Sequence, residues 1–171
     1  MKKTRRFVAL LLAAVLALAL FTACGAAGAE EPQSAIGKVY EDWFVGKINS
    51  KRPTDKPVQK VNVKRSEMRA ALAKIGEDGK FTAGDGWDEV DNDSKESWYW
   101  LILSDPRAWN VSANKTVDAV ALTPENLTQY GADSFITEKQ LYRINAYDIV
   151  TRVIDGKTYA AVYVHLEKAH S

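Results

Sequence analysis

Five residues near the carboxyl end of the chain have types and spacing suited to binding a polar ligand. Two β-rich runs within 141–166 flank Asp155-Gly156, a dipeptide typical of a two-residue hairpin turn. With that turn, Ile154 pairs with Lys157 and alternate side chains face opposite sides. One side is almost wholly apolar and is expected to meet the helices. The other side carries the five candidate residues: Asp148, Arg152, Tyr159, Tyr163 and His165.

The polar side of this hairpin is open to more than one interpretation. Asp148 and Arg152 lie on the same side of one strand, close enough to pair, with Tyr163 across from the acid and Tyr159 across from the base. Such a patch can hydrogen-bond a polar ligand while its rings stack on it. An exposed sheet face with ordinary cross-strand pairs is the more common explanation of such a pattern. Asp148, Tyr163 or His165 could also act as acid or base in a small hydrolase or isomerase.

Tryptophans are the second kind of candidate contact residue, because the chain has five. Trp87, in a polar stretch, and Trp109 are candidates for exposed contacts with a glycan. Trp43 falls on an apolar helix face and is expected in the core. Trp98 and Trp100 point the same way from one strand, so at least one of them is also expected in the core.

Metal and cofactor chemistry has little support in the residues present. The chain has two histidines and one cysteine, so no zinc site is expected. Acidic residues crowd into 85–93 and could hold calcium, but the EF-hand spacing is missing and a solvated acidic loop explains them better. We find no nucleophile elbow and no phosphate-binding glycine loop, so no cofactor is expected.

Periodicity predicts the elements that would position these residues. Apolar residues along one face predict a helix over 35–49 with Ser34 as its N-cap, and a second helix from Ser66 to about Gly76. Strands are expected at 98–103 and 117–122, with a weak one at 58–63 and a short helix after Thr123-Pro124. The expected fold class is α+β, with N-terminal helices packed on an antiparallel sheet that ends in a long C-terminal β-hairpin.

The first 25 residues have a different character from the rest. Residues 1–6 carry four cations and no acid, 7–21 are an unbroken apolar run, and small residues follow. This order is typical of a secretory signal peptide. Since crossing a bilayer takes about 20 apolar residues, the run is short for a permanent span.

The stretch Leu20-Phe21-Thr22-Ala23-Cys24-Gly25 resembles the lipobox of bacterial prolipoproteins. Ala23 and Cys24 fit that pattern, whereas Phe21 departs from the usual Leu. The resemblance implies cleavage before Cys24, lipidation of its sulfur and attachment to membrane lipid on the extracytoplasmic face of the cell membrane. The alternative is that Cys24 is incidental and ordinary signal cleavage occurs nearby.

These features divide the chain into a signal peptide (1–23), a flexible tether (24–33) and a single globular domain (34–171). Without the signal, 148 residues remain. Four of the 23 basic residues leave with it, so 19 face 22 acids and the net charge changes from +1 to −3. A weakly acidic domain gives no support to a nucleic-acid partner.

The order of elements, helices first and a long hairpin last, resembles that of nuclear-transport-factor-2-like domains, which would imply a pocket between sheet and helices. Our leading hypothesis is a membrane-anchored, extracytoplasmic binding module whose partner is a cell-envelope protein or glycan. A small envelope hydrolase or isomerase is the main alternative. A structural subunit that docks on another envelope protein is the third.

Overall fold

The computed structural model describes residues 33–90, 96–105, 114–134 and 136–168. These residues belong to one structural unit that begins at Gln33. Within these ranges, no helix is both long enough and apolar enough to cross a membrane.

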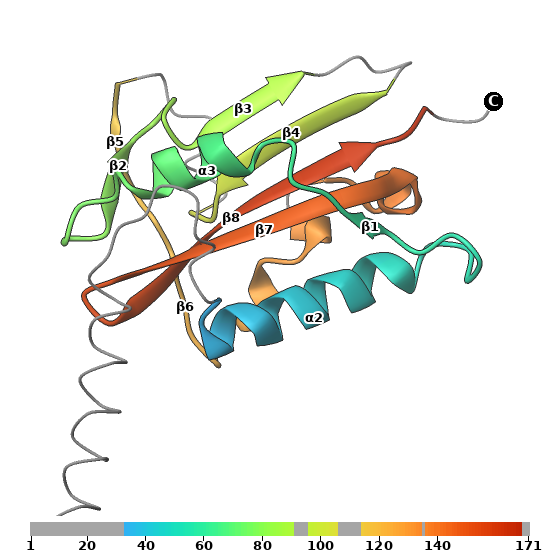
Figure 1. Ribbon diagram of the computed structural model, residues 1–171, viewed down its shortest axis with the longest axis horizontal. Helices are drawn as coiled ribbons and strands as arrows, with labels where there is room; N and C mark the ends of the chain where they lie inside the picture. Colours follow the sequence, from blue (N-terminus) through green and yellow to red (C-terminus); the bar gives the residue numbers. More distant parts are fainter. Residues whose placement is uncertain (1–32, 91–95, 106–113, 135, 169–171) are drawn as a thin grey trace, which may run out of the picture. The chain divides into compact units, whose positions relative to one another are not determined.

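A mixed β-sheet built around two long strands is the centre of the fold (Figure 1). Its order in the described residues is β1-β7-β8-β4-β3, and β6 pairs with the beginning of β8. β1 runs parallel to β7, and the other pairs are antiparallel. The strands span Gln59–Lys60 (β1), Trp87–Val90 (β3), Ser97–Ile102 (β4), Ala121–Leu122 (β6), Ile144–Ile154 (β7) and Lys157–Leu166 (β8). A separate pair joins β2 (Lys80–Thr82) to β5 (Thr116–Asp118), and the whole is the expected α+β class.

The turn between β7 and β8 has the predicted length and register. Ile154 pairs with Lys157, and Val153 pairs with Thr158. Asp155 and Gly156 both have positive φ, 48° and 71°, as a type I′ turn requires. The prediction of a two-residue turn is therefore confirmed.

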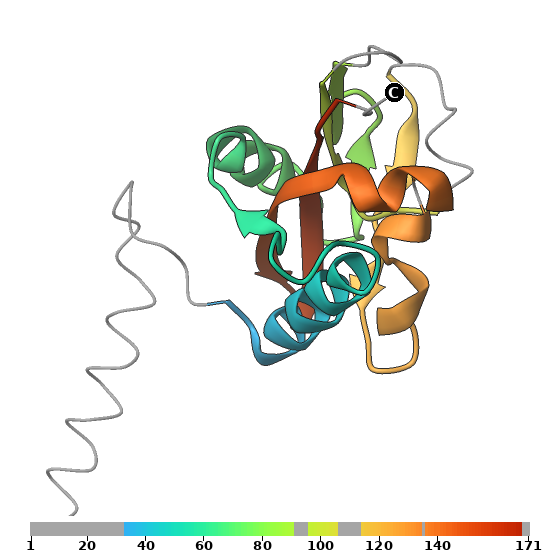
Figure 2. The ribbon, with the colours of Figure 1, turned by 90° about the vertical axis from the view of Figure 1, so that its right-hand side faces the viewer.

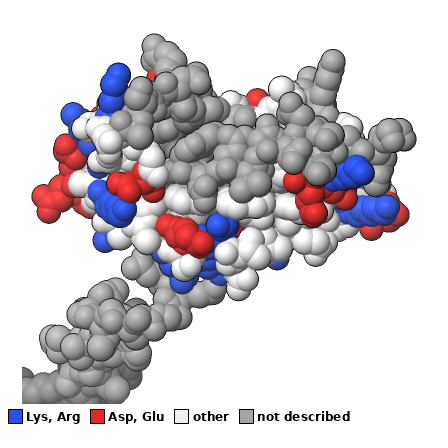
Figure 3. Space-filling view, turned by 90° about the horizontal axis from the view of Figure 1, so that it is seen from above, with Lys and Arg blue, Asp and Glu red and all other residues white. Residues whose placement is uncertain are grey.

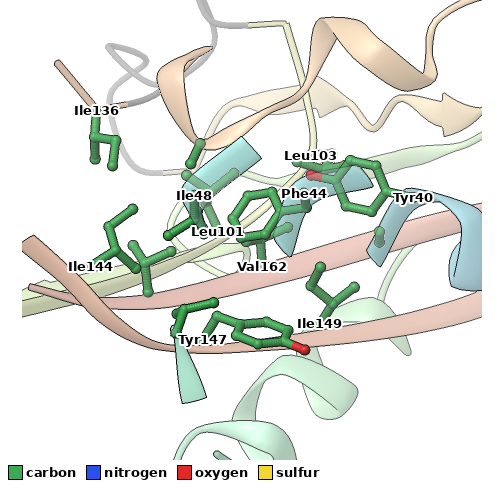
Figure 4. Close-up of a cluster of buried hydrophobic side chains, with 14 of the residues drawn as sticks. Tyr40, Phe44, Ile48, Leu101, Leu103, Ile136, Ile144, Tyr147, Ile149 and Val162 are labelled. Atoms are coloured by element: carbon green, nitrogen blue, oxygen red, sulfur yellow. The ribbon is translucent and has the colours of Figure 1, made fainter. Parts of the chain in front are cut away.

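Helix α2 (Ala35–Asn49) covers the apolar side of the hairpin, as expected. The Ser34 hydroxyl accepts a hydrogen bond from the backbone N–H of Gly37 and so caps the helix. Three side chains of α2 are fully buried against the sheet: Tyr40, Phe44 and Ile48. Figure 4 shows them above Leu101, Val162, Ile149 and Tyr147, which come from three neighbouring strands.

Helix α3 (Arg65–Leu72) covers the opposite side of the same sheet. Its buried residues Met68, Ala71 and Leu72 pack on Val150 and Ala161 of the hairpin. The polar side is therefore not an exposed face, and Figure 2 shows the two helices on opposite sides of the long strands. This corrects the expectation that the helices meet only the apolar side.

Four local predictions differ from the structure. The second helix ends at Leu72, one turn before the expected Gly76. The strand predicted at 117–122 is divided between β5 and β6, which belong to different sheets. The strand signal at 58–63 yields only β1. The helix predicted after Thr123-Pro124 is the single 3₁₀ turn Leu127–Gln129, because the Asn126 side chain accepts from Thr123 N–H and donates to a neighbouring carbonyl, which satisfies this backbone without a helix. Two more 3₁₀ segments, Ala132–Ser134 and Glu138–Arg143, lead into β7.

The substitution Gly156→Ala should lower the free energy of unfolding by about 1 kcal/mol, because its φ of 71° strains a residue with a side chain. Gly46→Ala is the matched control. A Cβ at Gly46 in α2 meets nothing within 4 Å, so helix propensity should raise stability by about 0.5–1 kcal/mol. Urea denaturation measures both changes. A Gly156→Ala variant as stable as the wild type would contradict the assigned turn.

Candidate ligand-binding site

Asp148 is the most deeply buried of the five predicted site residues, with none of its surface exposed. Arg65 Nε donates to its Oδ2 at 2.9 Å, and Arg65 Nη2 donates to its Oδ1 at 2.8 Å. The N–H of Ile149 also donates to Oδ1, at 3.0 Å. Both carboxylate oxygens are therefore engaged within the protein.

The predicted pair of Asp148 with Arg152 is wrong. The Cα atoms of residues four positions apart on an extended strand lie about 13 Å from each other, and both oxygens of Asp148 are already engaged by Arg65. The first residue of α3, Arg65, instead pairs with Asp148 on the face of the sheet that α3 covers. The N-cap position of α3, Lys64, makes no side-chain capping bond, and this bidentate pair helps to fix the start of the helix.

The two tyrosines of the predicted patch are paired as expected but are buried. Tyr163 lies across from Asp148, and Tyr159 lies across from Arg152. Both belong to the hydrophobic cluster beneath α3. Burial, together with the negative charge of Glu96, raises the pKa of Tyr163. Their rings therefore fill the core and are not available for stacking on a ligand, and Arg152 is half-buried.

The part of this sheet face that remains partly exposed lies beyond the start of α3, around Trp98. Trp98 pairs with His165 across β4 and β8. The Lys64 ammonium lies 4.2 Å from the centroid of the indole ring, and the Tyr163 ring lies on the core side with its centroid 6.3 Å away. We call the following five residues the Trp98 patch: Lys64, Glu96, Trp98, Asn145 and His165.

Hydrogen bonds hold the imidazole of this patch from both sides. His165 Nε2 lies 2.9 Å from Glu96 Oε1, and His165 Nδ1 lies 2.7 Å from Asn145 Oδ1. Glu96 is exposed, whereas His165 is largely covered. The ring is therefore fixed in orientation, with both nitrogens already in contact with side-chain oxygens.

A β-bulge brings Asn145 to His165. The register of β7 shifts between Ile144 and Ala146, so the strict alternation that the sequence predicts is interrupted there. Ile144 and Tyr147 both face α2, and the two residues between them lie opposite His165. Arg52 Nη1 donates to the carbonyl of Ile144 at 2.6 Å and so secures the backbone at the bulge.

The predicted tryptophan contacts have mixed outcomes. Trp87 lies on β3 opposite Leu101 and not in a loop. Trp109 lies outside the described residues. Trp100 is buried, and Trp43 is partly buried against the α2 cluster, as expected. Trp98, the other member of the pair from which we expected at least one core residue, is partly exposed and is therefore the aromatic candidate.

A second polar cluster surrounds Glu41, which the sequence did not single out. Its carboxylate accepts hydrogen bonds from Lys60 at 2.7 Å, Tyr147 at 2.9 Å and Gln33 at 3.0 Å. Burial raises the pKa of Glu41, but the three donors outweigh burial and lower it overall. The signal was present in the sequence, because Glu41 falls on the apolar stripe of α2 between Tyr40 and Phe44.

The described ranges hold no group of three His, Cys, Asp or Glu residues that could bind a metal ion. In the acidic stretch, Asp85 pairs with Lys74 at 2.6 Å, and residues 91–93 lie outside the described residues, as does Cys24. Comparisons with protein-family models, with curated proteins and with solved structures give no match. The function is therefore argued from the site itself.

Asp148→Asn should lower the free energy of unfolding by about 3 kcal/mol, because it leaves the Arg65 charge without its buried partner. Asp42→Asn is the control of the same type. It removes an exposed pair with Lys38, so the expected loss is below about 0.5 kcal/mol. Chemical denaturation of both variants measures the difference. Equal losses would show that the Arg65 pair does not fix α3.

Proposed function

We propose that this chain is the precursor of a lipid-anchored, extracytoplasmic binding module that contacts a cell-envelope glycan through the Trp98 patch. The observation that carries the proposal is a partly exposed indole ring surrounded by hydrogen-bonding and charged side chains at one end of the sheet. Aromatic rings stack on the apolar faces of sugars, and the neighbouring polar groups hydrogen-bond the hydroxyls.

The Trp98 patch favours a glycan that carries a carboxylate. Lys64 lies over the indole with its ammonium 3.5 Å from Glu67 Oε1, on a flexible stem. A sugar that stacks on Trp98 displaces this ammonium, and a carboxylate on the sugar then provides it with a new partner. Fragments of peptidoglycan combine sugar rings with carboxylates and have this chemistry.

Attachment to a membrane is supported by the sequence and by the start of the domain. The lipobox-like stretch ends at Cys24, and the structural unit begins at Gln33. Nine residues separate Cys24 from Ser34, a spacer that spans at most about 30 Å. An acylated Cys24 would therefore hold the domain close to the lipid surface.

The geometry favours binding over catalysis. Asp148 has both oxygens engaged by Arg65, and His165 has both ring nitrogens beside side-chain oxygens. Neither offers a free group for proton transfer to a substrate. The similarity in element order to nuclear-transport-factor-2-like domains stays a hypothesis. It would imply a pocket between sheet and helices, whereas the α2 side chains on the sheet side are fully buried.

The charge on one face of the domain agrees with a ligand that is not a polyanion. On the face drawn in Figure 3, acidic and basic side chains lie interspersed over the described residues. A nucleic-acid surface would need basic side chains gathered on one face, so we propose no nucleic-acid partner.

Mass spectrometry of the full-length chain expressed in a bacterial host tests the anchor. The mature protein should begin at Cys24 and carry the mass of its acyl chains, and it should sediment with membranes. Cys24→Ala should remove the acyl mass, whereas Ala27→Ser in the tether should retain it. An unmodified Cys24, or a mature end elsewhere, would overturn the lipoprotein proposal.

Calorimetric titration with soluble peptidoglycan fragments tests the ligand. Trp98→Ala should weaken binding by about tenfold, the loss expected when one stacking contact worth about 1.4 kcal/mol is removed. Tyr142→Ala removes an aromatic ring that is 50% exposed outside the patch and should bind like the wild type. No binding by the wild type, or equal binding by all three proteins, would contradict the glycan proposal.

A further inference from the structure

We infer that the tip of the β7–β8 hairpin, residues 152–157, rests on the lipid surface to which the chain is anchored. This inference depends on the proposed lipid anchor and adds the orientation of the domain on the membrane. It is carried by the position at which the folded domain begins, by the length of chain that precedes it and by the residues of the hairpin tip.

The folded domain begins directly beside the hairpin tip. The Thr158 hydroxyl donates to the Ser34 hydroxyl at 3.2 Å, and Ser34 is the N-cap of α2. The first turn of α2 also lies against the hairpin, because a Cβ on Gly37 would lie 2.8 Å from Thr151 Cγ2. Val153 lies directly across the hairpin from Thr158, so the tether leaves the domain next to Val153.

The length of the tether limits how the domain can lie. With an acylated Cys24, residues 25–33 allow Ser34 to lie at most about 30 Å from the lipid. Tyr147, toward the other end of β7, is six residues from Val153 and therefore about 20 Å farther along the strand. The tip is therefore the end of the sheet nearest the anchor, and Figure 1 shows the turn projecting beyond the first turn of α2.

The chemistry of the tip suits the surface of an anionic bilayer. Val153 is 54% exposed at the end of its strand, and its apolar side chain leaves water when it enters the headgroup region. Arg152 and Lys157 supply two cations within the tip against one acid, Asp155. Cations this close to a membrane are attracted to anionic headgroups within a Debye length.

Position is what distinguishes Val153 from Val63. Val63 is 62% exposed, but it follows β1, which pairs with Ala146 and Tyr147 at the far end of β7. Single exposed apolar residues are ordinary on protein surfaces, so exposure by itself predicts no contact with lipid. Of these two valines, Val153 lies beside the start of the tether and Val63 does not. Val63 is therefore a control of the same residue type.

The test uses the full-length, acylated protein reconstituted into phosphatidylcholine vesicles with phosphatidylglycerol as the minor component. Val153→Cys or Val63→Cys is labelled with an environment-sensitive fluorophore. Because the chain has one native cysteine, an acylated Cys24 leaves only the introduced thiol free to react. A quencher carried on the lipid headgroups should reduce emission from position 153 at least about twofold more than emission from position 63.

A separate variant tests whether the cations of the hairpin tip contribute to the membrane contact. Neutralising the two cations (Arg152→Gln with Lys157→Gln) in the Val153→Cys protein should reduce lipid quenching by about twofold. In vesicles without phosphatidylglycerol, quenching of the label at position 153 should be weaker than in vesicles that contain it. In those vesicles, neutralising the two cations should have little further effect.

The possible failures are distinguishable. One label per chain with equal quenching at positions 153 and 63 overturns the orientation and leaves the anchor intact. Two labels per chain show that Cys24 is unmodified, which overturns the proposed anchor and this inference with it. Circular dichroism of the labelled proteins identifies any variant that fails to fold, and Lys157→Cys then provides a second labelling position on the tip.

Discussion

The two-residue turn at Asp155–Gly156 fixes the register of β7 and β8, and the rest of the sheet is built outward from that pair. β8 is paired along its length with β7 on one side and with β4 and β6 on the other. A shift of one residue would move every side chain of one strand to the opposite face. It would turn Asp148 toward the apolar core beneath α2 and away from Arg65. The positive φ angles of the turn residues therefore determine which helix each strand residue meets.

Because side chains alternate between the two faces of a strand, two adjacent residues of β7 each fix one helix, on opposite faces of the sheet. Tyr147 points to one side and donates to Glu41 of α2, and Asp148 points to the other and accepts from Arg65 of α3. A buried carboxylate without a partner is costly, so each polar pair tolerates little displacement of its helix. Glu41 also binds Lys60, which connects the edge strand β1 to the same cluster. The helices therefore pack by apolar contact and are positioned by buried carboxylates.

In the proposed arrangement, the two ends of the hairpin have separate roles. The tip lies beside the start of the tether and faces the lipid, whereas the bulge at Asn145 and the Trp98 patch lie near the other end of the long strands. A rigid antiparallel pair of about ten residues holds the patch roughly 30 Å from the tip. A ligand contact surface on such a domain is directed away from the membrane, toward the envelope material that a tethered binding module would meet. Asn145, which the bulge turns toward His165, belongs to this outer end.

The sequence by itself determined the local features. It determined the helix at 35–49, the class of the fold, the hairpin and the pairs of Tyr163 with Asp148 and of Tyr159 with Arg152, because turn dihedrals and side-chain periodicity depend on neighbouring residues. The tertiary structure decided the partner of Asp148, the burial of the polar face under α3, the bulge at Asn145 and the role of Glu41. Each of these depends on residues far apart in the chain, and Arg65 and Asp148 are 83 positions apart. The partner of a buried charge is the group that tertiary packing brings within reach. The local sequence pattern does not indicate which group that is.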